Sequence, residues 1–460
     1  MRLKLLSLSV MTIGAAALSG QALASGYNFG SQSVSAQGTA HANGAEAADP
    51  STIYYNPAGL SNLDGTQIQI GLTSVMPSSS YTDGGSTRAA ASIPISGSKT
   101  ANNYVPSHVE APTLYLSSKL NDKWTVGLGI FVPYGAQLNY GSNWIGRYSV
   151  ENIKLETLNF NPSIAFKLDE QNSFGFGVSA QYMKAHLTKA VDSQSLAAAL
   201  NGGPWTLTLP QILALGDGQA DMTADGWGYG FNLGYMFKLD DHTRFGLAYR
   251  SQIKHTLDGN VKWTYDQVGN AAVAGVMNNL HSSSGASTDV TTPASASANF
   301  YHDINDKLAV MGNVTWTEHS DMDKIAIQFP GTGKGNMVIN QNWKDSWLYA
   351  LGLNYKYNDA LTLRTGVALD KSPANSQYIS AALPDGDRTW LSLGANYKFD
   401  KNQSIDFSYS YVWVKDVDMN YYDVCYGKGT GCTLTGNGEN TVGKYKTTFQ
   451  MIGLAYNYRF

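Results

Sequence analysis

The stretch that decides the fold is the last one, Lys444–Phe460, which reads KYKTTFQMIGLAYNYRF. Successive side chains of a β-strand point to opposite faces, so alternate residues share a face. One register is large and apolar or aromatic: Phe460, Tyr458, Tyr456, Leu454 and Ile452. The other register is mostly small or polar: Arg459, Asn457, Ala455, Gly453 and Met451. An apolar face that ends in Tyr and Phe is typical of the aromatic girdle of a transmembrane barrel, although a soluble sandwich strand also alternates.

The first 24 residues have the pattern of a secretory signal peptide. Arg2 and Lys4 form a basic start, Leu5 to Leu18 is apolar, and Ala22-Leu23-Ala24 is a small-residue cleavage site. We therefore expect residues 1–24 to be removed on export. No later window approaches the ~18 consecutive apolar residues of a membrane-spanning helix.

The composition favours a membrane barrel over a large secreted β-protein. Charged residues make up 14% of the chain, against ~25% in soluble domains. Aromatic residues make up 12%, with 28 Tyr, and there are 47 Gly. A barrel shows lipid only half of its residues, so its mean hydropathy stays modest. The net charge of -4 gives no footprint for nucleic-acid binding.

The spacing of turns predicts an all-β membrane protein, a 14-stranded antiparallel transmembrane β-barrel over residues 63–460. Asn and Asp suit tight hairpin turns because they tolerate left-handed backbone. Six such turns lie at 120–123, 168–171, 239–242, 304–307, 357–360 and 399–402. Seven longer connections lie near 77–103, 141–150, 193–222, 263–284, 327–340, 372–387 and 420–442. Short turns on one side, long loops on the other and an even strand count are the outer-membrane pattern.

Residues 25–62 differ from the rest because they lack a period of two. They include AEAADPSTIYYNPAGLSNLDG, in which Asp49-Pro50 and Asn56-Pro57 mark turns or helix boundaries. A disordered leader is one interpretation. Ile53, Tyr54 and Leu60 provide apolar residues to pack, so we favour a plug of short helical turns.

The third predicted strand, Trp124 to Tyr140, contains Pro133-Tyr134-Gly135 near its middle. Proline cannot donate to a strand ladder, and both Pro and Gly favour bulges and bends. The interruption is either a gap in the wall or a harmless bulge, and the spacing does not distinguish them.

Two long connections, Leu196 to Leu215 and Ala271 to Leu280, are too apolar for solvent loops. Exposed apolar patches mark binding grooves or partner surfaces, and packing of the two loops on each other as a lid is a compatible alternative. The candidate groove residues are Leu196, Leu200, Trp205, Leu209, Ile212, Leu215, Val273, Val276 and Met277.

The chemistry-bearing residues predict no enzyme, metal site or cofactor. Cys425 and Cys432 are expected to form a local disulfide in an exported chain. There is no G-x-S-x-G, H-E-x-x-H or phosphate loop, and the eight His residues are scattered. A Ser/His pair that uses His186 or His319 stays open from sequence alone.

The chain resembles the outer-membrane long-chain fatty acid and hydrocarbon transporters of the FadL type. The motifs that carry this resemblance are Tyr55-Asn56-Pro57-Ala58, Gly226–Asn232 (GWGYGFN), Tyr249-Arg250-Ser251, Arg364–Ala368 (RTGVA) and Pro384–Ser392 (PDGDRTWLS). They occur in the family's order over nearly the whole chain after the signal peptide.

The resemblance implies a mechanism. A hydrophobic small molecule (fatty acid, aromatic or alkane) would be caught in an extracellular groove and passed to a buried pocket. Movement of an N-terminal hatch at 25–62, with Asn56, Pro57 and Ala58 as its motif and Asn56 facing the kink, would open a lateral exit at Pro133-Tyr134-Gly135. Outer-membrane lipid and lipopolysaccharide would surround the barrel, and assembly machinery would bind Phe460. An adhesive surface barrel and a general porin are the alternatives.

The substrate headgroup is where the sequence departs from the family. Family members bind the ligand carboxylate with cationic side chains, and those positions fall at Lys189 and near Ile339. Position 189 has a cation, but it is Lys where the family has Arg. Position 339 is Ile, which carries no charge. A neutral hydrophobic substrate is therefore favoured, and Lys189 is either a headgroup ligand or an ordinary solvated charge.

Overall fold

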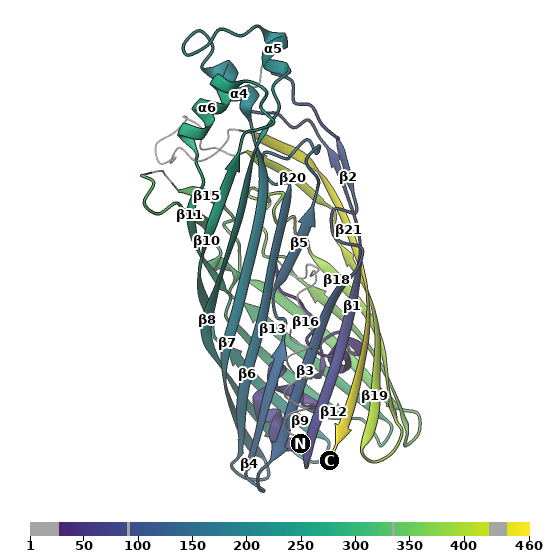
Figure 1. Ribbon diagram of the computed structural model, residues 1–460. Coiled ribbons are helices and arrows are strands. Elements are labelled where there is room, and N and C mark those ends of the chain that lie inside the picture. The colour runs from purple at the N-terminus through teal and green to yellow at the C-terminus, as the bar shows by residue number, and fades with distance from the viewer. Residues whose placement is uncertain (1–26, 90–92, 334–335, 423–438) are drawn as a thin grey trace.

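The computed structural model describes residues 27–89, 93–333, 336–422 and 439–460 (Figure 1). Its strand segments form one closed antiparallel sheet of fourteen spans, as predicted. Eight spans are single segments: β1 (Thr66–Asp83), β3 (Val109–Lys119), β6 (Asn152–Lys167), β7 (Asn172–Val191), β8 (Gly218–Lys238), β17 (Leu361–Asp370), β18 (Arg388–Lys398) and β21 (Asn440–Arg459). The signal peptide, Cys425 and Cys432 lie outside the described residues.

Six further spans are each built from two segments with a break between them. They are β4 (Trp124–Phe131) with β5 (Gly135–Asn139), β9 (Thr243–Arg250) with β10 (Ile253–Thr264), β11 (Ser284–Thr292) with β12 (Ser295–Asp303), β13 (Leu308–Thr317) with β14 (Lys324–Gln328), β15 (Met337–Asn340) with β16 (Ser346–Lys356), and β19 (Gln403–Val414) with β20 (Val417–Tyr422). A short β2 (Thr100–Asn102) pairs with the end of β1.

The barrel closes where β1 pairs with β21, in a register that runs from Gln67↔Arg459 to Asp83↔Gly443. The predicted alternation of the last strand is confirmed, because Leu454 and Tyr456 face outward while Met451 and Ala455 are buried. The Phe460 amide donates to the Thr66 carbonyl over 2.9 Å, which fixes the chain end to the start of the first strand. Its recognition by assembly machinery stays a prediction.

The two ends of the barrel differ as predicted. The six tight turns join neighbouring strands at the end that also holds the C-terminal Phe460, and the helices α4 (Ser193–Ala199), α5 (Leu209–Leu213) and α6 (Ala271–Leu280) lie at the other end (Figure 1). Some predicted loops were drawn too long, since β1 continues to Asp83 and β8 already begins at Gly218. Ladder hydrogen bonds extend a strand past the membrane whatever the polarity of its side chains. In the described chain, no helix is both long and apolar enough to cross a membrane.

The N-terminal segment, residues 27–63, lies inside the barrel, mainly in the half nearer the tight turns (Figure 1). Its turns are α2 (Val34–Gly38), 3-10 helix η1 (Asn43–Ala45), α3 (Thr52–Tyr55) and 3-10 helix η2 (Pro57–Asn62). α2 contacts β17, β18, β19 and β21, while η2 contacts β4, β6, β7 and β8. Nearly all of the segment is buried. This placement fits a plug rather than a leader, and the domain boundaries at residues 25 and 62 stay predictions.

The segment approaches the wall closely because the wall carries glycine at the contact points. A Cβ built on Gly366 would lie 2.2 Å from the carbonyl carbon and oxygen of Thr39. One built on Gly175 would lie 2.2 Å from the Ala58 amide nitrogen. Both obstacles are backbone atoms, so a larger residue at either position would force the segment away from the wall.

We predict that Gly366→Ala displaces the N-terminal segment near Thr39 while the barrel still folds. Overpacking of this kind costs about 1–3 kcal/mol. We expect this cost to weaken the packing of α2 against the wall. Limited proteolysis should therefore cut the segment faster than in the parent protein, with unchanged heat-modifiable migration of the barrel. The matched control is Gly285→Ala, whose Cβ would meet only the Gly259 carbonyl at 3.9 Å. Equal protection of the segment in both variants would contradict this account of its seating.

Candidate functional site

The third span of the wall is interrupted at the predicted kink. β4 ends at Phe131 and β5 begins at Gly135. β3 pairs with β4 only as far as Leu114↔Ile130, whereas β5 pairs with β6 alone. In the described residues, no ladder joins β5 to β3, so one edge of the wall is left without its strand partner here.

The N-terminal segment supplies partners to this open edge. Phe29 donates its amide to the Pro133 carbonyl over 2.8 Å, and the Gly135 amide donates to the Tyr27 carbonyl over 2.8 Å. Asn28 and Tyr134 form the antiparallel bridge between them. We call Tyr27–Phe29 with Pro133–Gly135 the latch. The latch joins the N-terminal segment to the side of the third span that has no strand neighbour.

The opposite edge of the kink is satisfied by a side chain. Tyr134 donates its amide to Thr157 Oγ1 over 3.0 Å, and that hydroxyl donates to the Tyr134 carbonyl over 2.6 Å. Gln32 adds a further contact, because its Nε2 donates to the Val132 carbonyl over 2.8 Å. The kink is thus held by side-chain hydrogen bonds from both directions, and not by a continuous ladder.

Asn56 is buried and lies against β8 and β9. Its Oδ1 accepts from the Ala58 amide over 3.1 Å, and its Nδ2 donates to the carbonyls of Tyr235 at 3.1 Å and Leu247 at 3.4 Å. That Asn56 faces the kink, as the resemblance implies, stays a prediction, and its side-chain hydrogen bonds to the wall are to β8 and β9. Pro57 and Ala58 lie over Gly175 and Gly234. The motif therefore seats the segment, and Gln32 and residues 27–29 meet the kink.

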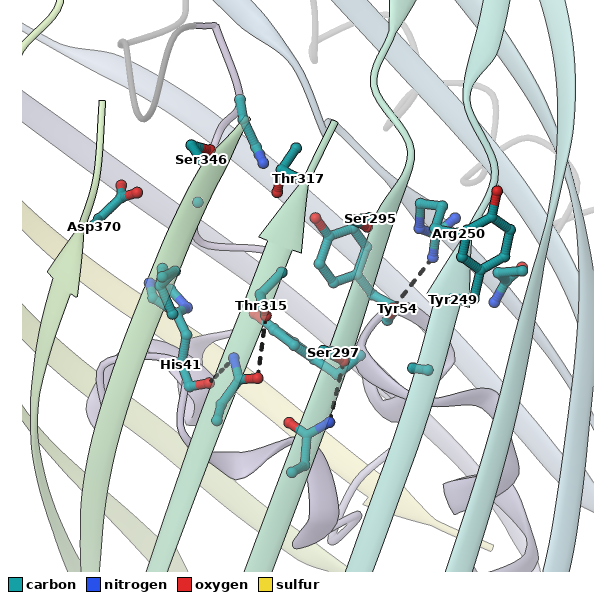
Figure 2. Close-up of a pocket in the computed structure, with 18 of the residues that line it drawn as sticks. His41, Tyr54, Tyr249, Arg250, Ser295, Ser297, Thr315, Thr317, Ser346 and Asp370 are labelled. Atoms are coloured by element: carbon teal, nitrogen blue, oxygen red, sulfur yellow. Dashed lines mark hydrogen bonds between the residues drawn. The ribbon is translucent and has the colours of Figure 1, made fainter. Parts of the chain in front are cut away.

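A cavity of about 110 Å³ lies between the N-terminal segment and the inner wall (Figure 2). Figure 2 shows Arg250 beside Tyr54 on one side and Asp370 on the other, with a row of hydroxyls between them. That row follows the strand register, since Arg250 pairs with Ser295, Ser295 with Thr317 and Thr317 with Ser346. The site is polar in a lumen that the sequence predicted to carry hydrophobic cargo.

Two buried groups that line this cavity have unsatisfied polar atoms. Both ring nitrogens of His41 and the indole Nε1 of Trp390 lack a hydrogen-bond partner. The two rings meet edge to face with centroids 5.1 Å apart. Burial lowers the pKa of His41 to about 4, so the imidazole is neutral at physiological pH.

The two predicted headgroup positions, Lys189 on β7 and Ile339 on β15, lie on strands that contribute side chains to one apolar cluster. Lys189 points inward from β7, is only 7% exposed and has no ion-pair partner among the described carboxylates. It is therefore not a solvated charge at a strand end. Ile339 packs against the cluster with Leu187. The cluster consists of Met222, Val261, Ala286, Ile327, Phe329 and Met337.

The predicted groove residues mostly pack on one another. Trp205, Ile212, Leu215, Val273 and Met277 are buried in one cluster, and Leu196 and Val276 pack against it. Leu200 and Leu209 remain 36% and 55% exposed. The Trp205 indole donates to the Ala197 carbonyl over 2.9 Å, which ties the cluster to α4. The loops pack on each other, and their roles as a lid or as a binding groove stay predictions.

The open Ser/His alternative does not assemble a catalytic triad. His319 Nδ1 lies 2.9 Å from Ser346 Oγ, but its Nε2 has no partner. A nucleophilic serine needs a histidine that a third group orients, and no described carboxylate holds this ring. His186 pairs instead with Asp221 over 2.9 Å. Among the residues described, no group of three or more His, Cys, Asp or Glu side chains is placed to hold a metal ion.

Sequence reasoning missed the latch partners and Arg250. Tyr27, Asn28 and Phe29 precede any recognisable pattern, and their pairing with residues 133–135 spans over a hundred positions. Arg250 was visible as part of Tyr249-Arg250-Ser251, and its inward register followed from the alternation of β9. Nothing in the pattern showed that it lacks a carboxylate partner.

Comparison with known proteins matches this architecture. A family model described as "Outer membrane protein transport protein (OMPP1/FadL/TodX)" matches residues 15–460. A Neisseria meningitidis chain, provisionally named an outer membrane protein, is 35% identical over 98% of each chain. The long-chain fatty acid transport protein of Salmonella typhi is 28% identical over 90% of this chain and 93% of that one.

Solved structures show the same fold. A Pseudomonas aeruginosa FadL homologue superposes with a TM-score of 0.81 at 25% identity, over 95% of this chain and 100% of that one. With a family model that covers nearly its whole length, the chain belongs to the OMPP1/FadL/TodX family of outer membrane transport proteins.

Proposed function

We propose that this outer-membrane barrel mediates passive uptake of long-chain fatty acids or other hydrophobic compounds, with release through the wall at the latch. The observation that carries the proposal is the edge of β5 at the kink, which has no strand partner and is met at Gly135 by the N-terminal segment. Farther along the same edge, the Asn139 amide donates to the Tyr104 carbonyl over 2.6 Å. Withdrawal of Tyr27–Phe29 would leave an opening toward the membrane with no broken strand ladder.

The route would follow the apolar groups of the lumen. It begins under the lid, passes the cluster around Met222 and Phe329, and reaches the rings at the kink. There Tyr54 meets Phe131 edge to face at 5.2 Å, and Tyr115 stacks on Phe131 at 5.8 Å. A lateral exit suits such a cargo because an apolar molecule leaves the protein directly into lipid and avoids water.

A reversible cross-link across the latch tests this route. Residues paired in an antiparallel ladder have Cα atoms about 4.5–5.5 Å apart, within the about 4.4–6.8 Å that a disulfide spans. We predict that Asn28→Cys with Tyr134→Cys, in a Cys425→Ser/Cys432→Ser background, blocks uptake of labelled fatty acid when oxidised. Reduction should restore it.

The single cysteine variants, treated with the same oxidant, are the controls. Full uptake through a cross-linked latch, with cross-linking verified on the purified protein, would refute the lateral exit. Absence of uptake for every hydrophobic compound, even in the parent strain, would refute transport itself and leave the adhesive or porin alternatives.

A second prediction concerns the seating of the segment. Asn56→Ala removes the cap on Ala58 and both wall contacts, each worth about 0.5–1.5 kcal/mol. We expect lower uptake at unchanged barrel abundance. Asn56 follows α3 directly, so its loss should loosen α3 and with it the position of Tyr54 at the kink.

The matched control is Asn62→Ala, at the other end of the 3-10 helix that Asn56 caps, where the side-chain amide donates to the Met236 sulfur over 3.2 Å. Uptake and immunoblotted outer-membrane protein are measured together in both variants. Normal uptake by the Asn56 variant would show that this seating does not matter for transport.

A further inference from the structure

Arg250 differs from the fully buried arginines of this protein in having no carboxylate partner. Arg88 meets Asp192, Arg147 meets Asp217, Arg364 meets Asp406, and Arg388 meets Asp385. In the part of the chain that is described, no carboxylate lies within ion-pair distance of the partly buried Arg250. A cation in a partly dehydrated site is costly unless an anion or strong hydrogen bonds compensate it.

The hydrogen bonds of Arg250 are long. Its guanidinium donates to the Tyr54 carbonyl at 3.2 Å, to Ser179 Oγ at 3.3 Å and to Asn161 Oδ1 at 3.4 Å. Good N–H···O bonds cluster near 2.9–3.0 Å. All three acceptors are neutral, so the charge of Arg250 is only weakly satisfied.

Arg244, on the same face of β9, forms shorter hydrogen bonds to the N-terminal segment than Arg250 does. It donates to the carbonyls of Ala45 at 2.7 Å and Glu46 at 2.8 Å, and it lies over the Tyr301 ring at 4.2 Å. Both arginines hold the N-terminal segment to the wall. Arg250 alone lines the cavity of about 110 Å³.

The cavity has the size and chemistry for a polar headgroup. A cavity of 150 Å³ holds a benzene molecule, and a water needs about 10–15 Å³ by the same measure. The walls offer the hydroxyls of Ser295 and Thr317 and the unpartnered atoms of His41 and Trp390. At the far end of the cavity, Asp370 lies 3.6 Å from Arg388, which also pairs with Asp385. Arg250 is the cation that lines this cavity, and it has no carboxylate partner among the described residues.

Apolar surface adjoins that charge on the side of the kink. The guanidinium carbon lies 4.9 Å from the centroid of the Tyr54 ring and 5.7 Å from that of Phe131. Phe131 is the last residue of β4, directly before the latch. A molecule with an anionic head and an apolar chain would find both recognition elements here.

We propose that Arg250 binds the carboxylate of a hydrophobic monocarboxylate inside the lumen, with the chain against Tyr54 and Phe131. This inference rests on the proposed transport function and names its substrate class. The planar guanidinium matches a carboxylate through two parallel hydrogen bonds. A carboxylate bound there competes with the Tyr54 carbonyl, which loosens the N-terminal segment beside the latch.

The test compares dodecanoate with its uncharged methyl ester on the purified full-length barrel. Hydrogen bonds to a charged partner are strong enough that their loss weakens binding by about tenfold or more. Arg250→Gln should weaken dodecanoate binding by that factor and change methyl ester binding by less than about twofold. Arg250→Lys keeps the charge and should retain part of the preference for the carboxylate.

Arg244→Gln is the matched control, since it removes a neighbouring anchor of the same segment without altering the cavity. It should leave the preference for dodecanoate intact. Equal weakening of both ligands in Arg250→Gln would make Arg250 a structural anchor and overturn the proposal. So would a preference that persists in Arg250→Gln but is lost in Lys189→Gln. If the parent protein binds neither ligand, the transport function itself fails, and this result is distinct from the others.

Discussion

The constraint on which this structure depends is the absence of water in the hydrocarbon core, where each backbone amide and carbonyl must find a protein partner. Pairing of β1 with β21 meets this constraint by closing the sheet. At the third span the wall departs from it, because β5 has β6 on one edge and no strand on the other. On that open edge, the Gly135 amide donates to the Tyr27 carbonyl and the Asn139 amide donates to the Tyr104 carbonyl. Closure of the wall and placement of the N-terminal segment are therefore linked, because the segment bonds to the wall where the third span is interrupted.

The segment is held by contacts that water is able to replace. Gln37 donates to the Met451 carbonyl at 3.2 Å, Asn354 donates to Glu46 at 2.7 Å, and Asn56 bonds to β8 and β9. A hydrogen bond exchanged with water contributes only about 0.5–1.5 kcal/mol net, whereas a buried large apolar side chain contributes about 1.5–3 kcal/mol. Glycines such as Gly366 bring the segment to the wall with little side-chain interdigitation. The hydrogen bonds that seat the segment are thus separate from the strand ladder that closes the barrel.

How much of this was predictable from the sequence depends on the range of the interactions. The strand alternation of Ile452 to Phe460 and the Asn/Asp turns are local, and both appear in the structure as predicted. The proline at 133 marked the interruption because its effect on the ladder is also local. The partner of that interruption was not visible, since Tyr27–Phe29 lie over a hundred residues away. The contacts of Asn56 and the missing carboxylate near Arg250 follow only from how the N-terminal segment lies inside the barrel.

The polar cavity bears on which hydrophobic molecules this barrel suits. A cavity lined by hydroxyls, an imidazole and a guanidinium is expected to hold water that hydrogen-bonds these groups. An alkane or aromatic hydrocarbon that displaced this water would form no hydrogen bonds with His41, Trp390 or Arg250. Displacing ordered water without replacing its hydrogen bonds weakens binding. A carboxylate replaces the water and adds a charge partner for Arg250, while its chain keeps the contact with Tyr54 and Phe131. The loss of a cation at Ile339 favoured a neutral substrate, but that position lies in an apolar cluster elsewhere in the lumen. Charge complementarity beside the latch instead favours a hydrophobic acid.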